Sequence, residues 1–266
     1  MNPLQSSQLP PATSTLAPTG PQRLRVATYN IHKGVRGVGP GRRLEIHNLC
    51  LGVKALDADM VFLQEVRSLN REEAKRFPGW PAMPQAEYLA PEGYGVAYHT
   101  NAITKHGEHG NALLSRWSLG EIGHHDVSDH RFEQRGLLHV RVTWQDTEVH
   151  AIVAHFGLGH TGRVRQCERL GAFIEANVPD DAPLVVAGDF NDWGEKLDSI
   201  LRPTRLARAL QPSGQRALTF PSRVPVFAMD RIYTRHFKCV STHVPRGTTW
   251  ARMSDHLPLV AEFELA

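Results

Sequence analysis

Short apolar runs dominate the hydrophobic pattern of this chain. They are rich in Val, Ile, Leu and aromatic residues, which is typical of β-strands. The runs occupy residues 24–31, 60–66, 111–117, 136–144, 149–156, 184–190, 227–233 and 257–264. Several are almost continuously apolar, as expected for strands that are buried on both faces. The pattern therefore predicts a fold in which strands predominate.

Two segments between these runs show helical spacing instead. Residues 43–57 and 162–177 each place apolar side chains on one stripe, with Cys50 in the first stripe and Cys167 in the second. Thr161 is the predicted N-cap of the second helix. Because strands outnumber helices and the helices fall between groups of strands, we predict an α/β fold of two sheets packed face to face, with helices outside.

The first 22 residues differ in composition from the rest. Residues 1–22 contain several prolines and no charged side chain, and they lack the basic and apolar regions of a signal peptide. We expect them to form a disordered tail, because they cannot bury enough apolar surface to become ordered. From residue 23 to residue 266 the composition is uniform, which predicts a single domain.

Composition and charge exclude several classes of protein. The 30 basic and 27 acidic side chains give a formal charge of +3, too small for extensive coating by nucleic acid. The 3 cysteines are far apart, so neither a disulfide framework nor a cysteine zinc site is expected. No apolar run approaches the roughly 20 residues of a membrane helix. We expect a cytoplasmic monomer without a transmembrane segment.

Polar side chains stand at the ends of several predicted strands, where apolar residues would be usual. These residues are Asn30, Glu65, His155, Asp189, Asn191, Asp230 and the triplet Ser254, Asp255 and His256. Each has a local explanation as a turn former, a surface acid or a cap. A buried, unpaired carboxylate is costly, however, and strand ends along one edge of a sandwich converge. The recurrence of polar side chains at strand ends therefore predicts one pocket that contains acids and histidines.

Seven ordered segments resemble the endonuclease/exonuclease/phosphatase superfamily. They are TYNIHKG (28–34), LQEV (63–66), HGNALLSR (109–116), AHFG (154–157), GDFNDW (188–193), MDRIY (229–233) and SDHLPL (254–259). The segments TYNIHKG, GDFNDW and TFPSRVPVFAMDRIY (219–233) look particularly like those of a bacterial branch of small stand-alone members. The resemblance extends from about residue 24 to the end and implies a four-layer α/β/β/α sandwich of two mixed sheets.

This resemblance implies hydrolysis of phosphate esters, most often diesters, with a divalent ion. Glu65 is the first candidate metal ligand, Asn30 supports the metal or its water, and Asp255 is a second candidate ligand. Carboxylate oxygens favour hard ions, so Mg²⁺ or Mn²⁺ is the expected cofactor.

The same resemblance gives catalytic roles to five residues. Asp189 orients and deprotonates the attacking water, and Asn191 donates to a phosphoryl oxygen. His256 bonds the phosphate, and Asp230 fixes its tautomer and favours its charged form. His155 contacts the phosphate or the leaving group. A rival assignment makes His256 the base and leaves Asp189 to orient the water.

Other residues are candidates for contact with the substrate. Asn111, Arg135 and His32 are assigned to this group, with Lys33 beside His32; packing, surface charge or a tight turn would explain them as well. Trp193 forms either a wall of the cleft or ordinary packing. The substrate class stays open between a lipid headgroup, a small molecule and a nucleic acid.

Three hypotheses therefore follow from the sequence. The first is a metal-dependent phosphodiesterase, the second is a DNA endonuclease or exonuclease, and the third is a catalytically inactive binding protein on the same scaffold. The complete set of acids, amides and histidines argues against the third.

Overall fold

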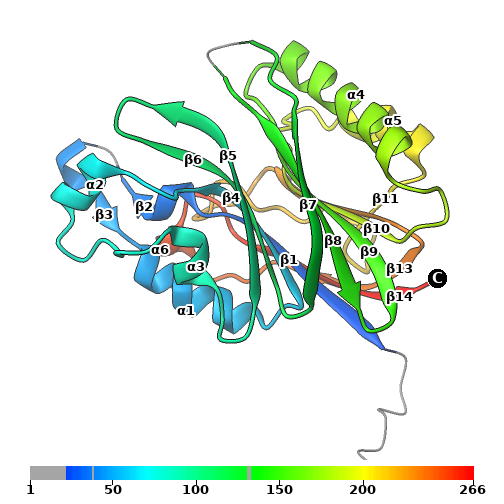
Figure 1. Cartoon of the computed structure of the whole chain (residues 1–266), viewed down its shortest axis with the longest axis horizontal. Helices are drawn as coiled ribbons and strands as arrows, with labels where there is room; N and C mark the ends of the chain where they lie inside the picture. Colours follow the sequence, from blue (N-terminus) through cyan, green and yellow to red (C-terminus); the bar gives the residue numbers. More distant parts are fainter. Residues whose placement is uncertain (1–21, 38, 131–132) are drawn as a thin grey trace, which may run out of the picture.

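Two large sheets lie face to face, with helices on their outer faces (Figure 1). The structure is a computed structural model that describes residues 22–37, 39–130 and 133–266. The predicted α/β/β/α arrangement is confirmed. The predicted tail, residues 1–22, lies outside the described residues except for Gln22.

The first sheet has six strands in the order β13-β14-β1-β4-β6-β5. Its strands are β1 (Arg23–Asn30), β4 (Met60–Val66), β5 (Gly95–Thr104), β6 (Gly107–Ser115), β13 (Phe237–His243) and β14 (Leu259–Leu265). β1 and β4 are parallel neighbours, while β1 and β14 are antiparallel. The carboxyl ends of β1 and β4 therefore meet at one edge of this sheet.

The second sheet also has six strands, in the order β11-β12-β10-β9-β8-β7. Its strands are β7 (Ser118–Asp126), β8 (Gly136–Trp144), β9 (Thr147–His155), β10 (Leu184–Asp189), β11 (Ala207–Arg208) and β12 (Asp230–Arg235). β9 and β10 are parallel neighbours, and β12 runs antiparallel to β10. The carboxyl ends of β9 and β10 thus lie beside the start of β12.

The helices divide between the two outer faces. α1 (Ile46–Leu56), α3 (Gln85–Leu89) and α6 (Trp250–Met253) contribute to the core outside the first sheet, and α4 (His160–Asn177) and α5 (Leu197–Leu201) to the core outside the second. The short helix α2 (Arg71–Arg76) and a ribbon of β2 (Val35–Arg36) and β3 (Arg43–Leu44) complete the chain, with short 3-10 turns at His32–Gly34, Gly39–Gly41 and Arg202–Thr204. Among the described residues, no helix has the length and apolar character to cross a membrane.

Three apolar cores hold these layers together. The central core joins side chains of both sheets, such as Phe62 of β4 and Val153 of β9. The two outer cores lie between each sheet and its helices; Cys167 is buried in one, and Cys50 packs against the other. Since both cysteines pack among apolar side chains, their place in the predicted helical stripes is confirmed.

The strands that the apolar pattern did not predict lie at sheet edges. β5 and β13 are the outer strands of the first sheet, and β7 and β11 are the outer strands of the second. Edge strands bury fewer side chains and carry more polar residues, so their hydrophobic signal is weak. The eight predicted strands are confirmed, with ends shifted by a few residues. The predicted N-cap Thr161 is wrong: α4 begins at His160 and Gly159 is its N-cap.

A pair of histidines on the outer face of the second sheet makes stability depend on pH. Nε2 of His139 lies 2.9 Å from Nδ1 of His150, a distance at which one ring donates a hydrogen bond to the other. Burial and the neighbouring His150 lower the pKa of His139 to about 4, and burial also lowers the pKa of His150. In the unfolded chain both rings titrate near pH ~6.5. The folded state therefore binds protons less readily than the unfolded state.

We expect the contribution of this histidine pair to the free energy of unfolding to be complete above pH ~6.5 and to be lost as the pH decreases toward about 4. Urea unfolding over this range measures the fall. It should be shallower in His139→Gln than in the wild type, while the exposed control His160→Gln should follow the wild type. Parallel curves for His139→Gln and the wild type would contradict this account.

Candidate functional site

The polar residues predicted at strand ends meet at one edge of the sandwich. Asn30 ends β1 and lies beside the end of β4, which carries Glu65. In the second sheet, Asp189 at the end of β10 pairs with His155 on one side and with Asp230 on the other. The parallel pairs in the two sheets thus bring residues from distant parts of the chain to one place.

Asp189 is the centre of this group. Its carboxylate is buried, and its Oδ2 accepts a hydrogen bond of 3.0 Å from Nδ2 of Asn30. The same Asn30 nitrogen lies 3.3 Å from Oε1 of Glu65. Asn30 therefore joins a carboxylate of each sheet, and in this arrangement its nitrogen, rather than its oxygen, faces them.

His256 lies between two carboxylates. Its Nδ1 is 2.8 Å from Oδ2 of Asp230, and its Nε2 is 3.6 Å from Oδ2 of Asp189. Burial disfavours the charged ring, but the adjacent Asp230 and Asp189 outweigh it and raise the pKa of His256 to about 10. The ring is consequently a cation with both nitrogens directed at acids.

Glu65 leaves the regular alternation of its strand. Its φ is 57°, and the pairing of β4 with β6 shifts register between Leu63 and Val66. Such a bulge redirects a side chain and is common beside active sites. Nζ of Lys33 lies 2.8 Å from Oε2 of Glu65. Burial opposes ionisation, but Lys33 holds the pKa of Glu65 well below its usual range.

His155 contributes a neutral ring to the site. Its Nε2 is 3.7 Å from Oδ2 of Asp189. Burial, with the nearby charge of Arg135, lowers the pKa of His155 to about 4. Arg135 itself forms an ion pair of 3.3 Å with Glu133. The two histidines beside Asp189 therefore differ in charge at neutral pH.

Two asparagines of the predicted site bind backbone groups. Asn191 has a φ of 48°; its N–H donates to Oδ1 of Asp189 at 2.9 Å, and its Nδ2 donates to the carbonyl of Phe156 at 3.0 Å. Nδ2 of Asn111 donates to the carbonyls of Gly136 and Val153 at 2.9 and 3.3 Å. Asn111 is completely buried, and these two bonds link β6 of the first sheet to β8 and β9 of the second.

His32 and Asp255 form the more exposed side of the site. Nδ1 of His32 lies 3.1 Å from Oδ2 of Asp255, and both side chains are partly exposed. Burial opposes ionisation of Asp255, but the hydrogen bond from His32 outweighs burial and lowers the pKa of Asp255. The segment is anchored by the hydroxyl of Ser254, which donates to the carbonyl of Asn30 at 2.7 Å.

A group of aromatic rings lies beside His256, in which Trp193 was a candidate from the sequence but Phe220 and Phe227 were not. The Phe220 ring lies 4.8 Å from the His256 ring, and Trp193 packs edge-on against both Phe220 and Phe227. Trp193 and Phe227 are partly exposed. The only sequence signal for Phe220 was its place in the segment TFPSRVPVFAMDRIY (219–233), which also contains Asp230.

The donor set fits a hard divalent cation. Side-chain atoms of Asp189, Asp230 and His256 lie within 4.8 Å of one another. The two carboxylates offer oxygen ligands, whereas the charged His256 ring has no free lone pair for a metal. Oδ1 of Asp230 is buried and has no hydrogen-bond partner among the described residues. Asn30 links a third carboxylate, that of the partly buried Glu65, to Asp189. Oxygen ligands from several acids are what Mg²⁺ and Mn²⁺ prefer.

Comparison with known proteins identifies the family of this chain. A profile of the endonuclease/exonuclease/phosphatase family matches residues 27–256, which include Asn30 and His256. The uncharacterized protein YbhP of Escherichia coli (strain K12) is 34% identical over 249 residues, which cover 91% of this chain and 96% of YbhP.

Two solved structures share the fold at low sequence identity. The mannosyl-6-phosphatase of Bacteroides thetaiotaomicron VPI-5482 has a TM-score of 0.64 and 18% identity, over 90% of this chain and 99% of that one. TDP2 of D. rerio, complexed with single strand DNA product, has a TM-score of 0.63 and 15% identity, over 91% of this chain and 99% of that one. With the profile covering the whole site and a relative matching almost end to end, this chain belongs to the endonuclease/exonuclease/phosphatase family.

Proposed function

We propose that this protein is a divalent-metal-dependent phosphodiesterase that hydrolyses its substrate with an activated water. Membership of the family supports a phosphoester hydrolase, such as a nuclease or phosphatase. The observation that carries the proposal is the convergence of buried Asp189, Asp230 and His256 with Glu65 at one edge of the sandwich. A purely structural role would not require three acids and a charged ring in one buried cluster.

The geometry supports a distinct role for each group around Asp189. Both ring nitrogens of His256 face carboxylates, so the ring is suited to donate to a phosphoryl oxygen rather than to accept a proton. That leaves Asp189 to orient and deprotonate the water, as the first assignment proposes. Asn191 and the neutral His155 remain proposed contacts for the phosphate and the leaving group.

Glu65 is the proposed first ligand of the cation, with Asn30 supporting it and Asp255 as a second ligand. When bound, a Mg²⁺ or Mn²⁺ ion supplies positive charge at the phosphoryl oxygens. The Lys33 ammonium already neutralises one oxygen of Glu65. Asn30 keeps the carboxylates of Glu65 and Asp189 near each other despite their like charges.

Metal removal is expected to abolish turnover. With bis-p-nitrophenyl phosphate as substrate, EDTA should reduce the rate to background, and Mg²⁺ or Mn²⁺ should restore it. Glu65→Gln should raise the metal concentration for half-maximal activity by about 10–100-fold. Metal affinity falls by about this factor even when the group removed only supports a metal ligand. The assay is release of p-nitrophenol over a metal titration.

The exposed control Glu87→Gln should titrate as the wild type does. Full activity in EDTA would overturn metal dependence, and an unchanged titration of Glu65→Gln would remove Glu65 from the metal site. Hydrolysis of p-nitrophenyl phosphate but not of the diester would make the protein a phosphomonoesterase. Nicking of plasmid at low enzyme concentration, falling steeply with salt, would favour a DNA nuclease.

The complete site makes an inactive binding protein the weaker alternative. We also propose that the protein works as a monomer in the cytoplasm. Cys50, Cys167 and Cys239 are free thiols, which suits a reducing compartment.

A further inference from the structure

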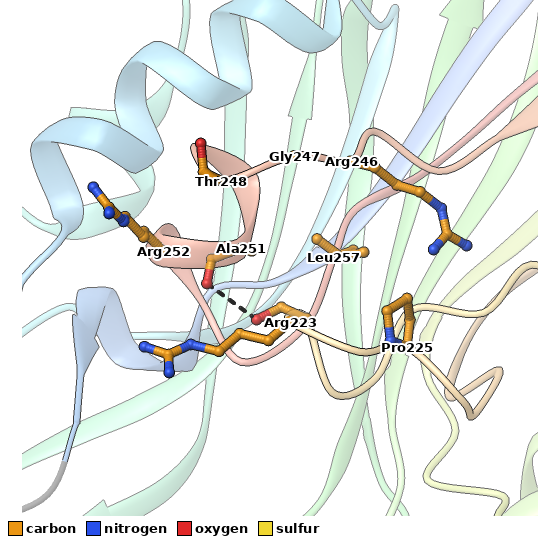
Figure 2. A pocket seen from close by; sticks show the side chains of 9 residues that line it. Arg223, Pro225, Arg246, Gly247, Thr248, Ala251, Arg252 and Leu257 are labelled. Atoms are coloured by element: carbon orange, nitrogen blue, oxygen red, sulfur yellow. Dashed lines mark hydrogen bonds between the residues drawn. The ribbon is translucent and has the colours of Figure 1, made fainter.

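A groove rich in arginine lies beside the catalytic cluster. It consists of two adjoining hollows of about 530 and 450 Å³, which share Arg223 and Arg252 in their walls. Arg246 lines the first hollow, and Arg36 and Arg43 line the second. We call the surface formed by these five residues the arginine groove. Figure 2 shows Arg223 and Arg252 extending to one side of the first hollow and Arg246 to the other.

The arginine groove shares a wall with the catalytic site. Leu257 lines the groove and is the residue after His256. Ser222, also in the lining, donates through its N–H to the carbonyl of Asp255 at 2.7 Å. A guanidinium nitrogen of Arg36 donates to the carbonyl of Ala251, which fixes the ribbon of β2 and β3 to α6. The segment that carries Asp255 and His256 therefore joins the catalytic cluster to the wall of the groove.

The positive charge of the groove is not neutralised by the protein. Within the described part of the chain, none of its five guanidinium groups forms an ion pair with a carboxylate. Elsewhere arginines are paired, such as Arg25 with Glu262 and Arg208 with Glu195. Glu45 also lines the groove, but its Oε2 accepts a hydrogen bond from Asn48 and the residue is nearly buried.

Concentrated and uncompensated guanidinium groups favour an anion, and their planar donors match phosphate oxygens. On the basis of the proposed function, we propose that the arginine groove binds a second phosphate group of the substrate, distinct from the phosphate that is cleaved. The preferred substrate class is then a molecule with two or more phosphates. Hydrolysis itself uses the cluster around Asp189 and does not require the groove.

The test compares two inhibitors that differ by one phosphate. Thymidine bisphosphate carries a phosphate on each side of its sugar, and thymidine monophosphate carries one. Each is used to inhibit hydrolysis of bis-p-nitrophenyl phosphate. We expect the wild type to bind the bisphosphate about tenfold or more tightly than the monophosphate. Such a difference corresponds to roughly one charge-assisted hydrogen bond.

The double variant Arg223→Ala/Arg252→Ala should lose this preference while its turnover of the small diester stays unchanged. Both side chains are exposed, so the fold should survive, and thermal unfolding checks this. The control Arg71→Ala/Arg202→Ala removes the same charge from exposed arginines elsewhere and should keep the preference. Added salt should weaken the preference in the wild type, because exposed charges are screened.

Calorimetric titration of both inhibitors separates this inference from the proposed function. If the wild type does not hydrolyse the diester but binds the bisphosphate more tightly through the groove, the proposed function fails and the anion site stands. If hydrolysis occurs and the double variant keeps the full preference, the anion site is wrong. Loss of binding to vesicles of anionic phospholipid in the double variant, with the phosphate preference intact, would also overturn it and assign the groove to a membrane surface.

Discussion

Replacing Asp189 with asparagine is expected to reduce kcat for bis-p-nitrophenyl phosphate by about 10²–10⁴-fold, the usual contribution of one acid–base or electrostatic group. Asparagine has nearly the same shape as aspartate, but it carries no charge and cannot take a proton from water. The rate should therefore fall while substrate binding changes less. Steady-state kinetics at saturating Mg²⁺ measures the loss.

The position of Asp189 explains why this loss should be large. Its carboxylate accepts hydrogen bonds from Asn30 and from the backbone of Asn191, and it faces both His155 and His256. No other acid of the described chain is placed at the junction of the two sheets with these contacts. The same contacts suggest that the asparagine variant will fold, because its side-chain oxygen still accepts the bond from Asn191.

Asp181→Asn is the matched control. Asp181 is exposed and lies before the opposite end of β10, so the same chemical change there should leave kcat unchanged. Near-normal turnover of Asp189→Asn would remove Asp189 from the mechanism and favour His256 as the base. An unfolded Asp189→Asn variant, detected by circular dichroism, would instead mean that the carboxylate is needed for the fold.

The second large effect concerns stability. Arg231→Met is expected to lower the free energy of unfolding by about 3–5 kcal/mol, because removing one partner of a buried ion pair leaves the other charge unpaired. Arg231 is completely buried, and its Nη1 lies 3.1 Å from Oδ2 of Asp192 and 3.2 Å from Oδ1 of Asp198. Urea unfolding monitored by fluorescence measures the change.

This ion pair supports the turn that follows β10 and carries Asn191. Asp192 follows Asn191 directly, and its Oδ2 also accepts the N–H of Leu197 at 3.0 Å. A guanidinium nitrogen of Arg231 donates to the carbonyl of Asp192 at 3.2 Å. Losing Arg231 should therefore loosen the turn that holds Asn191 against Asp189, and kcat should fall together with stability.

Two further variants make this result interpretable. Arg231→Met/Asp192→Asn removes both charges and should recover part of the stability lost in the single variant, because no carboxylate of the pair is then left buried. Arg165→Met breaks the exposed pair with Asp129 and should change stability far less. Equal losses for Arg231→Met and Arg165→Met would contradict the importance of burial.

Much of the fold was predictable from the chain because the interior strands record their burial in the sequence. The runs that became β1, β4, β9 and β10 are mostly apolar, and each is central in its sheet. The edge strands β5, β7 and β13 were not predicted, since exposure lets polar residues replace apolar ones. The start of α4 was also misplaced, because a glycine N-cap leaves a weaker signal than threonine.

The sequence by itself determined which residue types stand at the strand ends, since polar groups that follow apolar strands are visible in one dimension. Tertiary structure alone decided how they combine. Asn30 and Asp189 are 159 positions apart, and only the packing of the two sheets brings them within 3.0 Å. The bulge that redirects Glu65 and the arginines gathered from separate loops depend likewise on neighbours distant in the chain. A local pattern records the burial of each residue, whereas a site requires the relative placement of segments that only a folded core fixes.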